Sequence, residues 1–78
     1  MKHVITVIGA GNGGTAIAAH LTSAGAETRL CDLFPQYIEG IKTAGGIELT
    51  DNGKTVFVSP ALVTDDVPAA VQGAKLIM

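Results

Sequence analysis

The chain has 78 residues, enough for one small domain or part of a larger one, and 47% of them are hydrophobic while 15% are charged. A domain of this length buries only about 60% of the surface that its unfolded chain exposes, so such an apolar composition predicts surface that further protein covers. Five basic and seven acidic residues give a net charge of −2. No basic stripe is present, which argues against nucleic-acid binding.

The N-terminal residues predict neither a targeting segment nor a membrane partner. The apolar run that starts at Val4 breaks at a glycine after five residues, too short for a signal peptide or a membrane span. Cys31 is the only cysteine, so it cannot form an internal disulfide, which fits a reducing compartment. We therefore expect a cytoplasmic protein.

The first half of the chain predicts a strand, a helix and a second strand. Val4–Ile8 is a continuous run of apolar and β-branched residues, as in a parallel strand covered on both faces. Residues 12–24 predict a helix that Gly25 terminates. Its apolar positions follow the spacing i, i+4, i+7, with two small residues suited to close packing: Ile17, Leu21, Ala24, Ala16 and Ala18. The second strand, Glu27–Cys31, ends at Asp32.

A second helix and a hairpin come next. Residues 34–44 predict a helix with Pro35 in its first turn and two glycines, Gly45 and Gly46, at its end. The following letters, IELTDNGKTVFVS, predict a β-hairpin, because Asn52-Gly53 is a strong signal for a type I′ turn.

The last segment predicts a short strand at 61–63, a helix through Gln72 capped by Asp65 or Asp66, and a strand at 75–78. This alternation indicates an α/β fold: a partial Rossmann domain, with a doubly wound parallel sheet and an inserted hairpin. The first strand should lie between the second and the last.

The chain stops inside a predicted strand, so we expect it to be truncated before the domain is complete. Residues 1–78 would then be the N-terminal part of a dinucleotide-binding domain, without a catalytic C-terminal domain and inactive alone. An unpaired apolar strand edge recruits other chains. We therefore expect self-association or a larger assembly.

The letters GAGNGG place the pattern G-x-G-x-x-G between a predicted strand and a predicted helix. Gly9 permits the tight turn, Gly11 lets the backbone approach a pyrophosphate, and Gly14 lets the helix pack closely on the strand. Free N–H groups around Asn12 and Gly13, at the positive end of the helix dipole, would bind the phosphates. The alternative is a glycine-rich turn without a ligand.

Asp32 follows Gly14 by eighteen residues, close to the roughly 20 expected for the acid that binds the adenosine ribose. A carboxylate accepts hydrogen bonds from two ribose hydroxyls and repels a 2′-phosphate. The next residues, Leu33, Phe34 and Pro35, carry no positive charge, which favours NAD over NADP. The alternative for Asp32 is a cap of the following helix.

Other polar residues form weaker patterns. His3 and His20 have no partner visible in the sequence, and Cys31 is better explained as a small core residue than as a nucleophile. The pair Asp65-Asp66 fits a helix cap or a solvated turn better than a metal site. We therefore predict no metal site and no catalytic residue within the chain.

Three segments, VIGAGNGGTAIAAHLTSAGAETRLCD, IEGIKTAGGIELT and VTDDVPAAVQGAKLIM, resemble the N-terminal domain of the octopine/opine dehydrogenases. These enzymes belong with the glycerol-3-phosphate, ketopantoate and 6-phosphogluconate dehydrogenases. The resemblance implies a dehydrogenase that moves hydride between a nicotinamide and a C–N bond, joining an amino acid to a 2-oxo acid. It implies the five residues Gly9, Gly11, Asn12, Gly13 and Gly14 as pyrophosphate contacts and Asp32 as the ribose acid.

Several alternatives stay open at this point. The chain could belong to another dehydrogenase of the same superfamily, of the glycerol-3-phosphate or ketopantoate type, or to a non-catalytic nucleotide-sensing module. A flavoprotein is disfavoured by Asp32, since FAD enzymes usually carry glutamate there. A methyltransferase is disfavoured by the small residues Gly14 and Ala18, which favour the dinucleotide pattern.

Overall fold

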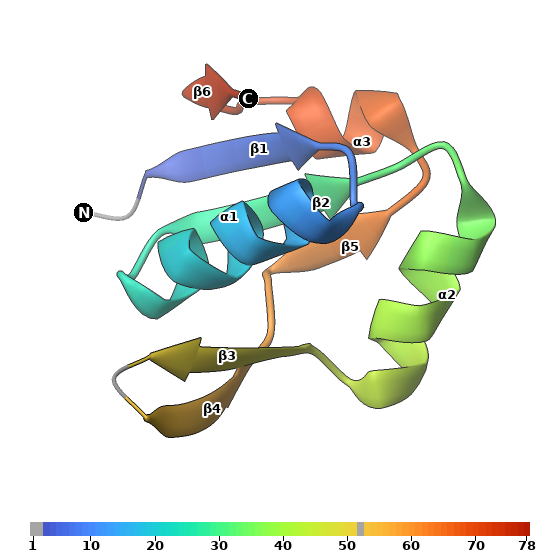
Figure 1. Ribbon diagram of the computed structural model, residues 1–78. Coiled ribbons are helices and arrows are strands. Elements are labelled where there is room, and N and C mark those ends of the chain that lie inside the picture. The colour runs from blue at the N-terminus through green and yellow to red at the C-terminus, as the bar shows by residue number, and fades with distance from the viewer. Residues whose placement is uncertain (1–2, 52) are drawn as a thin grey trace.

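The computed structural model describes residues 3–51 and 53–78, without the side chains of Asn12 and Asp51. This part of the chain contains six strands and three helices, which alternate except where three strands follow one another after the second helix (Figure 1). The strands are β1 Val4–Ile8, β2 Glu27–Cys31, β3 Ile47–Asp51, β4 Lys54–Val58, β5 Leu62–Thr64 and β6 Leu76–Ile77. The helices are α1 Asn12–Ser23, α2 Pro35–Ala44 and α3 Val67–Val71.

Four strands form a parallel sheet in the order β5-β2-β1-β6, while β3 and β4 form a separate antiparallel hairpin. The register pairs Val7 with Leu30 between β1 and β2, and Ile5 with Leu76 between β1 and β6. The predicted position of the first strand between the second and the last is confirmed. The α/β class, with a hairpin inserted between α2 and β5, is confirmed as well.

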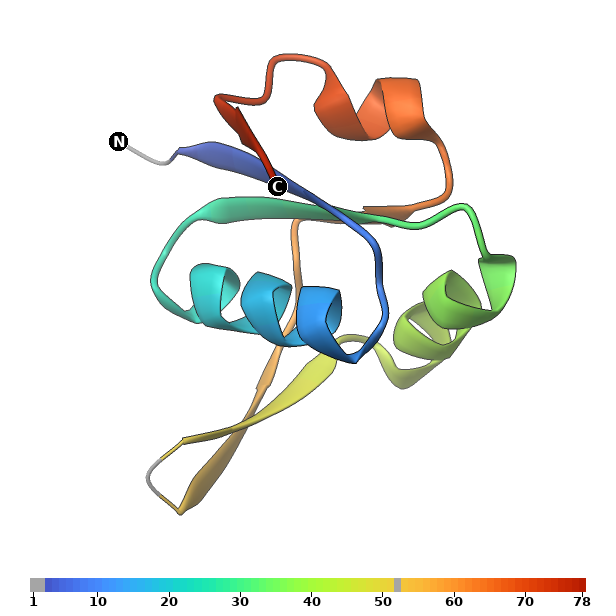
Figure 2. The same ribbon diagram turned by 45° about the horizontal axis from the view of Figure 1, so that its top comes forward.

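Helices lie on both faces of the sheet, with α1 and α2 on one side and α3 on the other (Figure 2). On the α3 side, the Thr6 hydroxyl donates to the Ala70 carbonyl at 2.5 Å, and the Arg29 guanidinium donates to the same carbonyl at 3.2 Å. On the α1 side, Val7 and Leu30 are buried in the main hydrophobic core. The sheet is therefore doubly wound around β1 and β2.

The buried face of α1 differs from the predicted one. Ala18 and Ala19 are fully buried, whereas Ile17 is 41% exposed. Leu21 packs against the core, but Ala24 is exposed and follows the helix as its C-cap. Ala16, also predicted to pack closely, is exposed. The short side chains of Ala18 and Ala19 face the sheet and allow the helix to approach it closely, and the longer Ile17 points outward.

The hairpin packs beneath α1 and extends the core away from the sheet. Ile47 and Leu49 are buried in the same cluster as Val7, and Val58 packs against that cluster. The predicted hairpin is confirmed, with Asp51 pairing with Lys54 across the turn. Asn52, on which the turn prediction rested, lies outside the described residues.

Several element boundaries differ slightly from the predicted ones: α1 ends at Ser23, α2 begins at Pro35, β5 covers Leu62–Thr64, α3 ends at Val71 and β6 covers only Leu76–Ile77. Local capping geometry explains the α3 start. The Asp66 carboxylate accepts a hydrogen bond from the Ala69 N–H at 3.2 Å, so Asp66 rather than Asp65 caps this helix.

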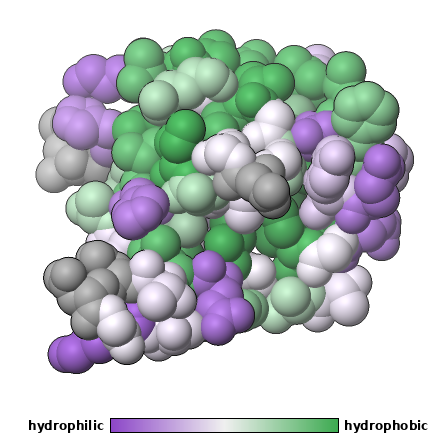
Figure 3. All heavy atoms as spheres, in the orientation of Figure 1, coloured by the Kyte–Doolittle hydropathy of each residue, from purple (hydrophilic) through white to green (hydrophobic). Residues whose placement is uncertain are grey.

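The strand β6 and the residue after it form an apolar edge of the molecule. Leu76, Ile77 and Met78 are each about half exposed, and hydrophobic surface gathers over β6 and α3 in the space-filling view (Figure 3). None of the helices in the described part of the chain combines the length and hydrophobicity that a membrane crossing requires.

Candidate functional site

The glycine-rich loop leaves β1 at the carboxyl end of the sheet, between β2 on one side and β6 on the other. Gly9 has a φ of +108°, which disfavours any residue with a Cβ. Its N–H donates to the Cys31 carbonyl at 2.7 Å, so the chain continues the β1–β2 ladder until it turns. At this point the strand order reverses, and ligands of doubly wound sheets bind in the crevice outside such a reversal.

Gly14 is required by the loop itself. A Cβ built at this position would lie 1.7 Å from the Gly9 carbonyl oxygen and 3.7 Å from Cγ1 of Val7. The obstacle is therefore mainly the turn at Gly9, with the β1 side chain at ordinary contact distance. The close approach of α1 to the turn depends on the absence of a side chain at Gly14.

At Gly11 and Gly13, the fold itself does not require a residue without a side chain. A Cβ built at either residue would meet nothing within 4 Å, and neither has a positive φ. Gly11 is the N-cap of α1 and offers no side chain to the first amides of the helix. Within the described part of the chain, a Cβ at either glycine would therefore extend into open space.

The first turn of α1 begins at Asn12. The first N–H groups of a helix have no partner within the helix, and here the first helical bond runs from the Thr15 N–H to the Gly11 carbonyl at 2.9 Å. The N–H groups of Asn12, Gly13 and Gly14 precede it at the positive end of the helix dipole. Backbone amides of this kind bind phosphate oxygens.

Asp32 lies at the end of β2, and its carboxylate points back to the glycine-rich loop. Oδ2 accepts a hydrogen bond from the Ala10 N–H at 2.6 Å, and Oδ1 accepts one from the Phe34 N–H at 2.8 Å. These amides hold the pKa of the Asp32 carboxyl below its usual value, with the Ala10 bond as the largest cause and burial acting against it. The carboxylate is therefore ionised beside the loop.

The bond to Phe34 bears on the alternative that Asp32 caps the following helix. Phe34 is the N-cap of α2, so the carboxylate bonds the turn that leads into the helix rather than the helix amides themselves. The bond to Ala10, which connects two turns far apart in sequence, had no signal in the sequence. Thr15 is a second residue that sequence reasoning missed, since its hydroxyl donates to the Ala10 carbonyl at 2.8 Å.

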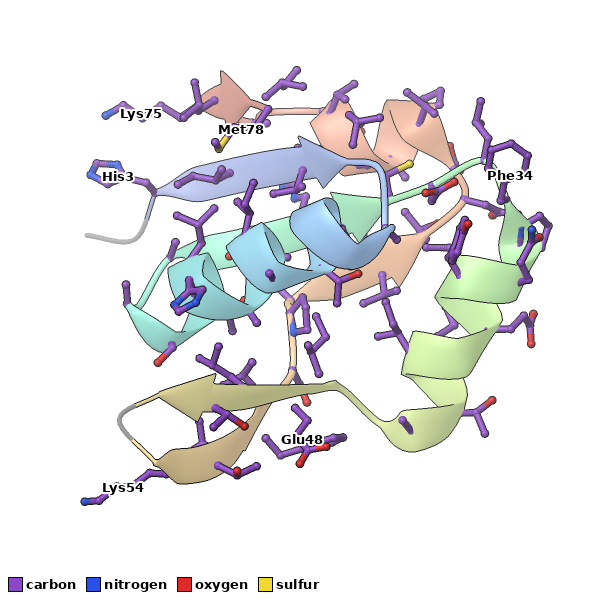
Figure 4. All side chains as sticks on the ribbon, in the orientation of Figure 1. His3, Phe34, Glu48, Lys54, Lys75 and Met78 are labelled. Carbon is purple, nitrogen blue, oxygen red and sulfur yellow. The ribbon has the colours of Figure 1, made fainter. Side chains whose placement is uncertain are left out.

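The surface next to Asp32 is apolar. Leu33 is 72% exposed and Phe34 60% exposed, and the Phe34 ring contacts Tyr37 edge to face at a centroid distance of 6.2 Å. Phe34 lies at the opposite end of the sheet from His3 and Lys75 (Figure 4). An apolar surface therefore adjoins the ionised carboxylate.

The remaining candidate residues lie elsewhere. Cys31 is fully buried, as expected of a core residue, and burial raises the pKa of its thiol, with smaller contributions from the carboxylates of Asp32, Asp65 and Asp66. His20 is exposed on α1, and His3 Nδ1 lies 3.4 Å from Lys75 Nζ at the far end of the sheet. Among the described residues, no group of three metal-ligating side chains comes together.

Comparison with known proteins places the chain in one superfamily. A family model described as the N-terminus of NAD-dependent glycerol-3-phosphate dehydrogenase matches residues 4–78. An opine dehydrogenase from Arthrobacter sp. (strain 1C) is 36% identical over 72 residues, which cover 92% of this chain and 20% of that protein. The chain therefore spans about a fifth of the length of this relative.

A solved structure shows the same fold. The crystal structure of 2-dehydropantoate 2-reductase from Porphyromonas gingivalis W83 matches with a TM-score of 0.66 and 26% sequence identity, over 99% of this chain and 28% of that chain. The resemblance to the N-terminal domains of this superfamily is thus confirmed. With the family model covering residues 4–78, the chain belongs to the family of NAD-dependent glycerol-3-phosphate dehydrogenase N-terminal domains.

Proposed function

We propose that this chain binds the ADP half of NAD, as the N-terminal part of the dinucleotide-binding domain of an opine dehydrogenase-like oxidoreductase. The catalytic residues would lie in a further domain of a longer protein. NAD, when bound, supplies the acceptor or donor of a hydride. The residues of this chain would bind and orient the cofactor.

The contrast between the glycines carries the proposal. Gly9 and Gly14 are needed to close the loop, because of the positive φ at the first and the close carbonyl contact at the second. Gly11 and Gly13 meet no such demand, and at Gly13, which lies within α1, glycine costs about 1 kcal/mol relative to alanine. A ligand that approaches the backbone explains them, and the unpaired amides of the first turn favour an anion such as a pyrophosphate.

Asp32 would bind the adenosine ribose. Its carboxylate uses one acceptor position on each oxygen for the Ala10 and Phe34 amides. A carboxylate has about four such positions, so two remain for the ribose hydroxyls. The negative charge beside exposed Leu33 and Phe34 would repel a 2′-phosphate, which supports NAD as the preferred cofactor.

The substrate class rests on the relatives. Similarity to an opine dehydrogenase over 92% of the chain supports a reaction at the C–N bond between an amino acid and a 2-oxo acid. The second candidate is a ketopantoate-type reductase, supported by the fold match with a TM-score of 0.66. Steady-state assays of the longer protein with both substrate classes would separate the two.

Calorimetric titration with NAD tests cofactor binding directly. Gly11→Val should abolish NAD binding while leaving the fold largely intact, because the added atoms occupy space that none of the described residues fills. Gly40→Val is the matched control, since Gly40 lies in α2 and a Cβ there also meets nothing within 4 Å. Equal NAD affinity of the two variants would contradict the proposed site.

A further inference from the structure

Ala10, the residue between the first two glycines of the loop, is held from both sides. Its N–H donates to Asp32 Oδ2 at 2.6 Å, and its carbonyl accepts the hydroxyl proton of Thr15 at 2.8 Å. Ala10 is only 5% exposed, so water has little access to replace these bonds. Asp32 and Thr15 therefore form a clamp on the Ala10 backbone, here termed the Ala10 clamp.

The Ala10 clamp acts on the part of the loop whose backbone has the most conformational freedom. Gly9 before it and Gly11 after it are both glycines, which have the largest conformational freedom in the unfolded chain. Two side-chain hydrogen bonds fix the peptide units between them, one from the end of β2 and one from the first turn of α1. The direction in which the chain enters α1 at Gly11 is thereby set.

We propose that the Ala10 clamp presets the loop amides for an anionic ligand, so that Asp32 and Thr15 are positioning residues for the pyrophosphate. This inference rests on the proposed function and deepens it. Asp32 then has two tasks: it accepts hydrogen bonds from the ribose, and it orders the loop that meets the phosphates. Thr15 has only the second task, because its hydroxyl is engaged with the Ala10 carbonyl.

Replacing Asp32 tests the clamp with a ligand that has phosphates but no ribose, because two opposite effects on its binding are expected. Removing a negative charge near the loop would by itself strengthen anion binding. Loss of the clamp would weaken it. Asp32→Asn produces both effects at once, because the amide keeps the shape of the side chain, loses its charge and turns an N–H donor toward one of two backbone donors. The clamp predicts that loss of the hydrogen bond outweighs loss of the charge.

The probe is inorganic pyrophosphate, with NAD in parallel. Both ligands are titrated into the wild-type protein and the variants, with binding followed by NMR at the Gly11 and Gly13 amides and NAD affinity measured by calorimetry. Asp32→Asn should weaken pyrophosphate binding, by less than the roughly tenfold expected for loss of one hydrogen bond to a charged group, because the lost charge partly offsets it.

Thr15 provides the matched pair of variants. Thr15→Val removes the hydroxyl at nearly constant volume and should weaken pyrophosphate binding by roughly fivefold, as for one neutral hydrogen bond. Thr15→Ser keeps the hydroxyl and should bind like the wild type. This pair decides the matter if Asp32→Asn does not fold.

The outcomes are distinct. If Asp32→Asn loses NAD affinity but binds pyrophosphate as tightly as the wild type or more tightly, Asp32 serves the ribose alone and the clamp is refuted. Equal pyrophosphate affinity of Thr15→Val and Thr15→Ser also refutes it, as does a wild-type protein that binds NAD but no pyrophosphate. A wild-type protein that binds neither ligand would instead overturn the proposed function.

Discussion

The backbone N–H of Ala10 donates to the Asp32 carboxylate over 2.6 Å, and this bond joins the loop after β1 to the end of β2. The two residues are 22 positions apart in the chain. A residue proposed to bind ribose is thus also hydrogen-bonded to the loop proposed to bind phosphate. Its ionisation state affects both the fold and the site.

Protonation of Asp32 should destabilise the folded chain at acidic pH. The Ala10 and Phe34 amides lower its pKa from the ordinary value of 3.8, so the unfolded chain takes up the proton first as the pH falls. The stabilisation is complete above about pH 5 and is lost as the pH falls through the lowered pKa. Urea unfolding at a series of pH values measures the free energy of unfolding. In the Asp32→Asn variant this free energy should fall less steeply toward acidic pH than in the wild type.

Glu39→Gln is the control for this experiment, since Glu39 is an exposed carboxylate on α2. It should keep the wild-type pH dependence. If the free energy of unfolding fell equally steeply toward acidic pH in Asp32→Asn and the wild type, the two amide bonds would not favour the ionised carboxylate.

Gly14→Ala should destabilise the chain by about 1–3 kcal/mol, the usual cost of overpacking. The added Cβ would lie 1.7 Å from the Gly9 carbonyl oxygen, so the turn or the helix has to shift. Thermal and urea unfolding measure the change. Gly40→Ala, in an open part of α2, should instead stabilise by about 0.5–1 kcal/mol. A Gly14→Ala variant as stable as the wild type would mean that the loop is not closed by this contact.

Cofactor preference should shift toward NADP in the double variant Asp32→Ser with Leu33→Arg. One negative charge is removed and one positive charge is added where the 2′-phosphate would lie. NAD affinity should fall by roughly tenfold to a few hundredfold through the lost hydrogen bonds to a charged group. Because the Asp32→Ser change also removes the carboxylate that bonds Ala10 and Phe34, the informative quantity is the ratio of the two affinities.

Calorimetric titration of the double variant and of Leu33→Arg alone with both cofactors provides this ratio. The single variant keeps the carboxylate and should retain the preference for NAD. The proposed role of Asp32 in cofactor choice would be wrong if the wild-type protein bound NADP as tightly as NAD.

The exposed edge at β6 should drive self-association of the isolated chain. Leu76, Ile77 and Met78 are about half exposed, and β6 pairs with β1 alone among the described strands. Exposed apolar edges recruit other chains. Sedimentation velocity should show oligomers of the wild type and a shift to monomer for Ile77→Lys. A wild-type chain that is monomeric at high concentration would rule out this edge as an association surface.

Local patterns in the sequence were sufficient for the elements and their order. Val4–Ile8 and Glu27–Cys31 are strands with the predicted bounds, because each ends at a turn residue, Gly9 or Asp32, and such a signal depends only on neighbours in the chain. The order of strands followed from the handedness of crossover connections, which applies to any parallel α/β unit. The position of the glycine-rich loop at the end of β1 was predictable because the G-x-G-x-x-G pattern directly follows the residues of that strand.

Tertiary packing alone decided which faces and groups meet. The rotation of α1 that buries Ala19 and exposes Ile17 depends on how closely the helix approaches the sheet, which helical spacing does not determine. The bond between Asp32 and Ala10 depends on the parallel register that brings the ends of β1 and β2 together. The sequence by itself thus determined the elements, the loop and the candidate residues, and the folded chain decided that Asp32 and Thr15 converge on Ala10, because hydrogen bonds between distant turns exist only once the sheet has formed.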